Sequence, residues 1–151
     1  MIVGYDLDGV LCTLFKPYKS YRLKNGEERK LYKRLKREHV GKAKCIRKTE
    51  GEIVYVVTAR KEELRYDTLK WLNANLIRFH RLCMLDTSRT RENIINFKKR
   101  MIEMYEIEKF FEDDPKIVKK LKKLCPQTEI VLIPVSESHI VNEEDAIKEL
   151  A

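Results

Sequence analysis

The chain has 151 residues, which suits one compact domain (residues 1–151) with a core large enough to fold without disulfides or a structural metal. Hydrophobic residues make up 43% of the chain and charged residues 37%, a balance that excludes a disordered tail. No apolar run approaches the roughly 20 residues of a membrane span. The apolar start also lacks the charged leader of a signal peptide, so we expect a cytoplasmic protein with no membrane partner.

The net charge of +8 is concentrated in one segment. Between Lys16 and Lys48 there are 14 Lys and Arg residues against three Glu, whereas the rest of the chain is mildly acidic. This pattern predicts a basic insert, residues 15–49, within the single domain. Three tyrosines lie among its basic residues: Tyr18, Tyr21 and Tyr32. These tyrosines are suited either to stack on nucleobases or to form the small core of the insert. The lysines are suited either to bind an anionic substrate or simply to keep a surface helix solvated.

Five short apolar runs have the composition of buried strands. They cover residues 2–6, 52–59, 82–85, 109–111 and 129–135. Helical patterns cover residues 27–39 (after a turn at Asn25-Gly26), 61–75, 91–105, 115–125 and 143–150. This alternation predicts an α/β fold, a Rossmann-like, mostly parallel five-stranded sheet with helices on both faces and a small basic cap insert after the first strand.

The first predicted strand runs directly into an acidic turn, Asp6-Leu7-Asp8-Gly9-Val10. Two aspartates at this spacing can face one metal ion, one through its carboxylate and the other through its backbone carbonyl. The second side chain then stays free for proton transfer, and the glycine lets the chain turn sharply beneath a ligand. Calcium-binding loops use a similar spacing but continue with further oxygen ligands, whereas apolar residues follow here.

Two more predicted strands end in residues that bind phosphate or metal. Thr58-Ala59-Arg60 presents a hydroxyl, backbone N–H groups and a guanidinium, and Glu112-Asp113-Asp114 adds three carboxylates. Because the carboxyl ends of parallel strands meet at one edge of a sheet, we expect these groups beside the acidic turn, with a cation that neutralises them. Lys98 lies on the apolar side of its predicted helix, where it could also extend outward to solvent, and Lys99 is the competing lysine.

In this order, the four elements resemble the motifs of the haloacid-dehalogenase-like (HAD) phosphatase superfamily, over residues 2 to about 135. The acidic turn resembles the first motif, Val56-Val57-Thr58 the second, Lys98 the third and Glu112-Asp113-Asp114-Pro115 the fourth. The second and fourth motifs are also similar to those of small nucleotidases and of polynucleotide 3′-phosphatase domains. The carboxylate of Asp8 favours phosphoryl transfer over dehalogenation within this superfamily.

The resemblance implies a set of roles for these residues. Asp6 would attack phosphorus and form an aspartyl-phosphate, and Asp8 would protonate the leaving group and later activate the hydrolytic water. Thr58 and Lys98 would hold the phosphoryl oxygens, together with Ala59 and Arg60 at the same strand end.

The same resemblance implies Mg²⁺ as the cofactor. The ion would be held by Asp6, the backbone carbonyl of Asp8 and a carboxylate of the fourth motif, for which Asp113 is favoured over Glu112 and Asp114. The expected activity is hydrolysis of a phosphate monoester, on a nucleotide or on a nucleic-acid end. The alternative is a nucleic-acid-binding or accessory protein on the same fold, with weak or secondary phosphatase activity.

Overall fold

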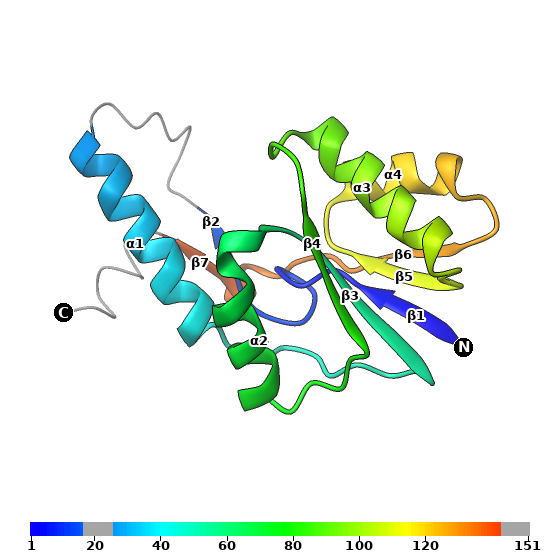
Figure 1. The fold of residues 1–151 in the computed structure, drawn as a ribbon, viewed down its shortest axis with the longest axis horizontal. Helices are drawn as coiled ribbons and strands as arrows, with labels where there is room; N and C mark the ends of the chain where they lie inside the picture. Colours follow the sequence, from blue (N-terminus) through cyan, green and yellow to red (C-terminus); the bar gives the residue numbers. More distant parts are fainter. Residues whose placement is uncertain (17–25, 143–151) are drawn as a thin grey trace.

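The computed structural model describes residues 1–16 and 26–142 of the chain (Figure 1). Its main sheet has five strands: β1 (Ile2–Tyr5), β3 (Ile53–Lys61), β4 (Arg81–Leu85), β5 (Lys109–Glu112) and β6 (Glu129–Leu132). The strand order is β4-β3-β1-β5-β6, and every neighbouring pair is parallel. The predicted parallel sheet is therefore confirmed, with all five strands where the apolar runs predicted them.

The described helices are α1 (Gly26–Lys42), α2 (Arg65–Ala74), α3 (Arg91–Met104) and α4 (Pro115–Leu124), with a 3₁₀ turn at Glu62–Leu64 before α2. Side chains cap two of them. Thr90 accepts a hydrogen bond from the N–H of Asn93 at the start of α3, and Asp114 accepts one from Lys116 at the start of α4. The helix predicted for residues 143–150 and Asn25 of the predicted turn lie outside the described residues.

Helices pack on both faces of the sheet, as predicted. α3 and α4 lie together on one face, where Phe110 and Leu121 are fully buried (Figure 1). α2 and the loop after β1 cover the other face, around Val56 and Leu72. Gly4 of β1 makes room for a core side chain, because a Cβ at this position would lie 2.6 Å from Cδ2 of Phe110.

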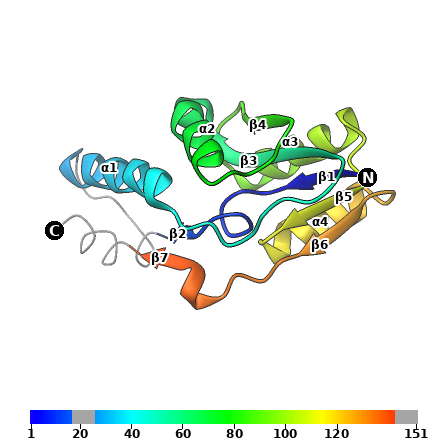
Figure 2. The same ribbon diagram turned by 90° about the horizontal axis from the view of Figure 1, so that it is seen from below.

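A second, two-stranded sheet was not predicted from the sequence. β2 (Leu14–Lys16) pairs in parallel with β7 (Ile140–Asn142), which follows a 3₁₀ turn at Glu137–His139. Strands of three residues are too short to show a period of two. The pairing brings the end of the described chain back beside the start of the basic insert, beyond the carboxyl ends of the large sheet (Figure 2).

The basic insert contains the helix predicted for residues 27–39, observed as α1. This helix packs beside α2, and the Arg37 Nε lies 3.8 Å from the Asp67 Oδ2. The ring Nε2 of buried His39 lies 3.0 Å from the carbonyl oxygen of Thr13. Tyr18 and Tyr21 lie outside the described residues, and the action of the insert as a cap stays a prediction.

None of the helices in residues 1–16 and 26–142 has the length and apolar character that crossing a membrane requires.

Candidate active site

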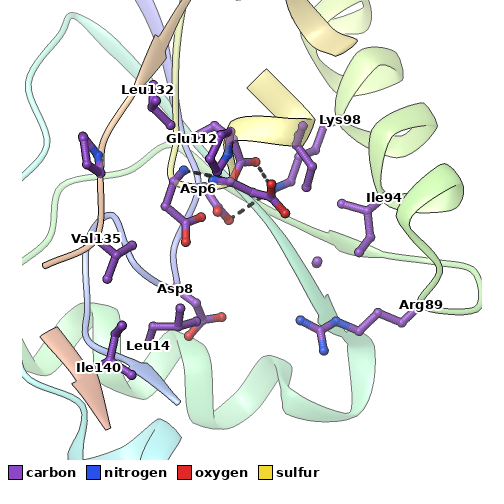
Figure 3. Close-up of a pocket in the computed structure, with 16 residues that line it drawn as sticks. Asp6, Asp8, Leu14, Arg89, Ile94, Lys98, Glu112, Leu132, Val135 and Ile140 are labelled. Atoms are coloured by element: carbon purple, nitrogen blue, oxygen red, sulfur yellow. Dashed lines mark hydrogen bonds and ion pairs between the residues drawn. The ribbon is translucent and has the colours of Figure 1, made fainter. Parts of the chain in front are cut away.

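A pocket of about 580 Å³ opens at the carboxyl ends of the strands (Figure 3). Its lining includes seven of the residues proposed from the sequence: Asp6, Asp8, Ala59, Lys98, Glu112, Asp113 and Asp114. Thr58 and Arg60 do not line the pocket but are buried, with 0% and 6% exposure. The strand ends therefore converge on one site, as parallel pairing predicted.

The floor of the pocket holds a buried lysine between two carboxylates. Asp6 directly follows β1, and its Oδ1 accepts a hydrogen bond of 2.8 Å from the N–H of Leu7. The Nζ of Lys98 lies 3.3 Å from this Oδ1 and forms an ion pair with Glu112. Lys98 is 1% exposed, so it does not extend to solvent, whereas Lys99 points outward and pairs with Glu103 at 3.5 Å.

The three acidic residues after β5 have different surroundings. Glu112 is fixed by Lys98 and by the N–H groups of Asp113 and Asp114, which donate to its Oε2 at 2.9 and 3.1 Å. Asp114 uses its carboxylate to cap α4. Asp113 faces Asp6, and carboxylate oxygens of Asp6, Glu112 and Asp113 lie within 4.8 Å of one another. Within the described residues, Asp113 is thus the one of the three whose carboxylate is held by neither a lysine nor a helix cap.

The cluster carries more negative charge than its lysine neutralises. Burial, followed by the charge of Glu112, raises the pKa of Asp6 well above its usual range. Burial also raises the pKa of Asp113 to about 7, again with a contribution from Glu112. Burial opposes ionisation of Glu112 as well, but the charge of Lys98 and the hydrogen bonds of Asp113, Asp6 and Lys98 together outweigh it and lower that pKa to about 2. Three carboxylates that share one ammonium group are a donor set that suits a divalent cation with oxygen ligands.

Asp8 is held by Arg60 instead of facing the lysine. The Nε and Nη2 of Arg60 donate to the two carboxylate oxygens of Asp8 at 2.9 and 2.7 Å. Burial would raise the pKa of Asp8, but the charge and hydrogen bonds of Arg60 outweigh it and lower that pKa to about 2. The register of β3 against β4 shifts between Thr58 and Lys61, and such a bulge re-aims side chains.

Within this bulge, the hydroxyl of Thr58 accepts a hydrogen bond of 3.1 Å from the N–H of Arg60. The structure thus gives Arg60 an orienting contact with Asp8, and phosphate contacts of Thr58 and Arg60 stay predictions.

Gly9 in the acidic turn is suited to its position by both conformation and space. Its φ is +84°, and a Cβ would lie 2.8 Å from the Cγ of Asp113. We expect Gly9→Ala to lower the free energy of unfolding by about 2 kcal/mol, because alanine resists this conformation and displaces Asp113.

Gly41 provides the matched control for this substitution, because nothing lies within 4 Å of its added Cβ. Gly41→Ala in α1 should change stability by no more than about 1 kcal/mol, in the stabilising direction. Urea denaturation measures both, and equal effects would show that the turn does not need glycine.

The sequence did not reveal two parts of the pocket. Arg89, in the loop after β4, lines the pocket, and Figure 3 shows its guanidinium pointing across it toward Asp8. Opposite Arg89 stands an apolar wall that includes Leu14, Val135 and Ile140. In the sequence, the only signal for Arg89 is its position in the loop that follows a strand. The apolar wall could not be predicted, because it depends on the pairing of β2 with β7.

Comparison with known proteins identifies the fold. No protein-family model matches the chain, and a search of curated proteins finds no match. Two similar solved structures are chains of a Pnkp1/Rnl/Hen1 RNA repair complex, with 20% and 19% sequence identity and TM-scores of 0.56 and 0.54. They match over 89% and 90% of this chain but 42% and 46% of their own length, so this chain spans less than half of each.

A third similar structure is a HAD-superfamily hydrolase, subfamily IA, variant 1, from Geobacter sulfurreducens. Its TM-score is 0.52 at 13% identity, and the match covers 99% of this chain and 95% of the hydrolase. The chain therefore has a HAD-like fold, which confirms the resemblance of its motifs at the level of the fold.

Proposed function

We propose that this protein is a Mg²⁺-dependent phosphatase that hydrolyses a phosphate monoester through an aspartyl-phosphate on Asp6. One observation carries the proposal: the carboxylate of Asp6 lies on the pocket floor, beside buried Lys98 and within reach of Asp113. A buried carboxylate with both a cation and a metal-ligating neighbour is suited to approach an anionic phosphate. The HAD-like fold supports this assignment.

The proposed reaction has two displacements at phosphorus. A carboxylate oxygen of Asp6 forms a bond to phosphorus while the bond to the leaving oxygen breaks, and Asp8 supplies the proton that this oxygen needs. Water then attacks the aspartyl-phosphate, Asp8 accepts the proton of the water, and free phosphate leaves. Because Arg60 favours the ionised form of Asp8, protonation of the leaving group requires Asp8 to separate from Arg60 first.

The carboxylates of the site fit the proposed cofactor. Asp6 and Asp113 would hold Mg²⁺, and Glu112, already bound to Lys98 and two N–H groups, would support them. When bound, the ion would neutralise the facing carboxylates and the substrate phosphate. Lys98 keeps Asp6 in place and offers its ammonium group to a phosphoryl oxygen.

A nucleotide or a nucleic-acid end is the proposed substrate. The basic residues of α1 stand beyond the carboxyl ends of the strands, where they would attract anions (Figure 2). Two structures with a similar fold come from an RNA repair complex, which supports the same substrate class.

The test is a screen with Mg²⁺ of an aryl phosphate, mononucleotides, sugar phosphates and oligonucleotides phosphorylated at either end. We expect hydrolysis that EDTA abolishes and added Mg²⁺ restores. Mg²⁺ should also raise the melting temperature by roughly 5 to 10 °C at pH 8 when present at 100 times its Kd. This shift should shrink at pH 5.5, because the raised pKa values of Asp6 and Asp113 make protons compete with the metal.

The direction of this pH dependence follows from the raised pKa values of the Asp6 and Asp113 carboxylates. Their folded-state pKa values lie above the ordinary aspartate value of 3.8, so the metal-free protein loses stability as pH rises from about 4 to about 7, and Mg²⁺ offsets that loss. Asp113→Asn should abolish the shift, whereas Asp86→Asn, an exposed residue paired with Arg100, should retain it. Salt-dependent oligonucleotide binding without any hydrolysis would instead favour the accessory-protein alternative.

A further inference from the structure

One side of the pocket carries a cation that the proposed reaction does not use. Arg89 lines the pocket opposite the apolar wall, and its guanidinium points inward (Figure 3). Within residues 1–16 and 26–142, this guanidinium forms no hydrogen bond and no ion pair. The neighbouring Asp8 is already held by the Nε and Nη2 of Arg60, and the charge of Arg89 makes only a minor further contribution to lowering the pKa of Asp8.

A second cation, from a different part of the chain, lies near Arg89 but outside the lining of the pocket. Lys36 of α1 is half-buried, and the charged groups that act on it include Arg89, Asp8 and Arg60. Burial and then the positive charge of Arg89 lower the pKa of Lys36. An anion bound at Arg89 would reduce the repulsion between these two cations.

The pocket has room for more than one phosphate group. A phosphate held at Asp6 and Lys98 occupies one end of the cavity of about 580 Å³, and Arg89 stands at another part of its lining. Figure 3 shows Leu14, Val135 and Ile140 along the side that faces Arg89. Such a wall suits the apolar faces of a sugar or a base, so that a nucleotide could connect the two anion-binding ends.

We propose that Arg89 binds a second phosphate of the substrate. This inference rests on the proposed function and specifies its substrate class: phosphomonoesters that carry another phosphate within one nucleotide, as nucleoside bisphosphates and phosphorylated nucleic-acid ends do. An isolated monoester would bind only at the Asp6 end of the pocket. Arg89 is therefore a specificity-determining residue.

The test compares kcat/KM for a nucleoside 3′,5′-bisphosphate with the better of the two corresponding monophosphates, in Mg²⁺ at low salt. We expect a preference of roughly ten- to a hundredfold for the bisphosphate, from a charge-assisted contact. Arg89→Gln should reduce this ratio to near one. The matched control is Arg91→Gln, an exposed residue outside the pocket lining that should keep the preference.

A wild-type ratio near one, or an equal fall in Arg89→Gln and Arg91→Gln, would overturn the inference. A dinucleotide with a terminal phosphate distinguishes the sources of the second anion. A preference that extends to the dinucleotide assigns the second anion to a nucleic-acid backbone, and one confined to the bisphosphate assigns it to free nucleotides.

If wild-type protein hydrolyses none of these compounds, the proposed function fails, but the second phosphate site can still be measured by calorimetry. Tighter binding of the bisphosphate than of either monophosphate, lost in Arg89→Gln, would support the site, and equal binding would overturn it.

Discussion

The Asp6→Asn variant should lose phosphatase activity by roughly 10⁴-fold, because an amide cannot form the bond to phosphorus. The variant should still fold. An Asn oxygen can accept the same hydrogen bond from the N–H of Leu7, and the substitution removes a buried charge that Glu112 and Asp113 disfavour. Since burial raises the pKa of Asp6, ionised Asp6 costs stability near neutral pH, and the urea midpoint at pH 8 should stay equal or rise.

The control is Asp86→Asn, which changes an exposed carboxylate outside the pocket lining and should keep full activity. Mass spectrometry after a rapid acid quench should detect phosphate on the peptide that contains Asp6 in the wild type alone. A variant that retains more than a tenth of the wild-type rate would remove Asp6 as the nucleophile, even if the protein is a phosphatase.

Lys98→Met should lower the free energy of unfolding by about 3 to 5 kcal/mol at pH 7, the range for breaking a buried ion pair. Burial disfavours the charged amine, but the carboxylates of Asp6 and Glu112 outweigh it and raise the pKa of Lys98. Without the ammonium group these carboxylates repel each other in a buried site. Lys99→Met removes a partly exposed ion pair with Glu103 in the same helix and should lower the free energy of unfolding by less than about 0.5 kcal/mol.

Measuring the free energy of unfolding of both variants at several pH values tests the same assignment in a second way. In Lys98→Met the unpaired carboxylates bind protons more tightly when folded than when unfolded, so the deficit should shrink as pH falls from 7 to 5. Adding Glu112→Gln to Lys98→Met should recover part of the loss by removing one of the unpaired charges. Equal effects of Lys98→Met and Lys99→Met in urea denaturation would contradict the assignment of Lys98 to the buried site.

Most of the architecture could be predicted because its signals are local. The apolar runs of the strands and the 3.6-residue period of α3 and α4 depend on residues close together in the chain. The position of Lys98 on the apolar side of its helix was visible in the same way. By contrast, β2 and β7 are three-residue strands whose pairing joins segments more than 120 residues apart, and no local pattern reveals such a contact.

The same distinction between local patterns and contacts of distant segments applies to the candidate site. The sequence by itself determined the residue types at the strand ends, from Asp6 and Asp8 to Asp113, because parallel strands bring their carboxyl ends to one edge. Only the tertiary structure decided which partner each side chain has. A bulge in β3 turns Arg60 onto Asp8, and Lys98 pairs with Glu112 as well as Asp6. Arg89 joins the pocket lining only through folding, because the position of a loop residue depends on contacts between distant segments, whereas strand and helix patterns depend on neighbours in the chain.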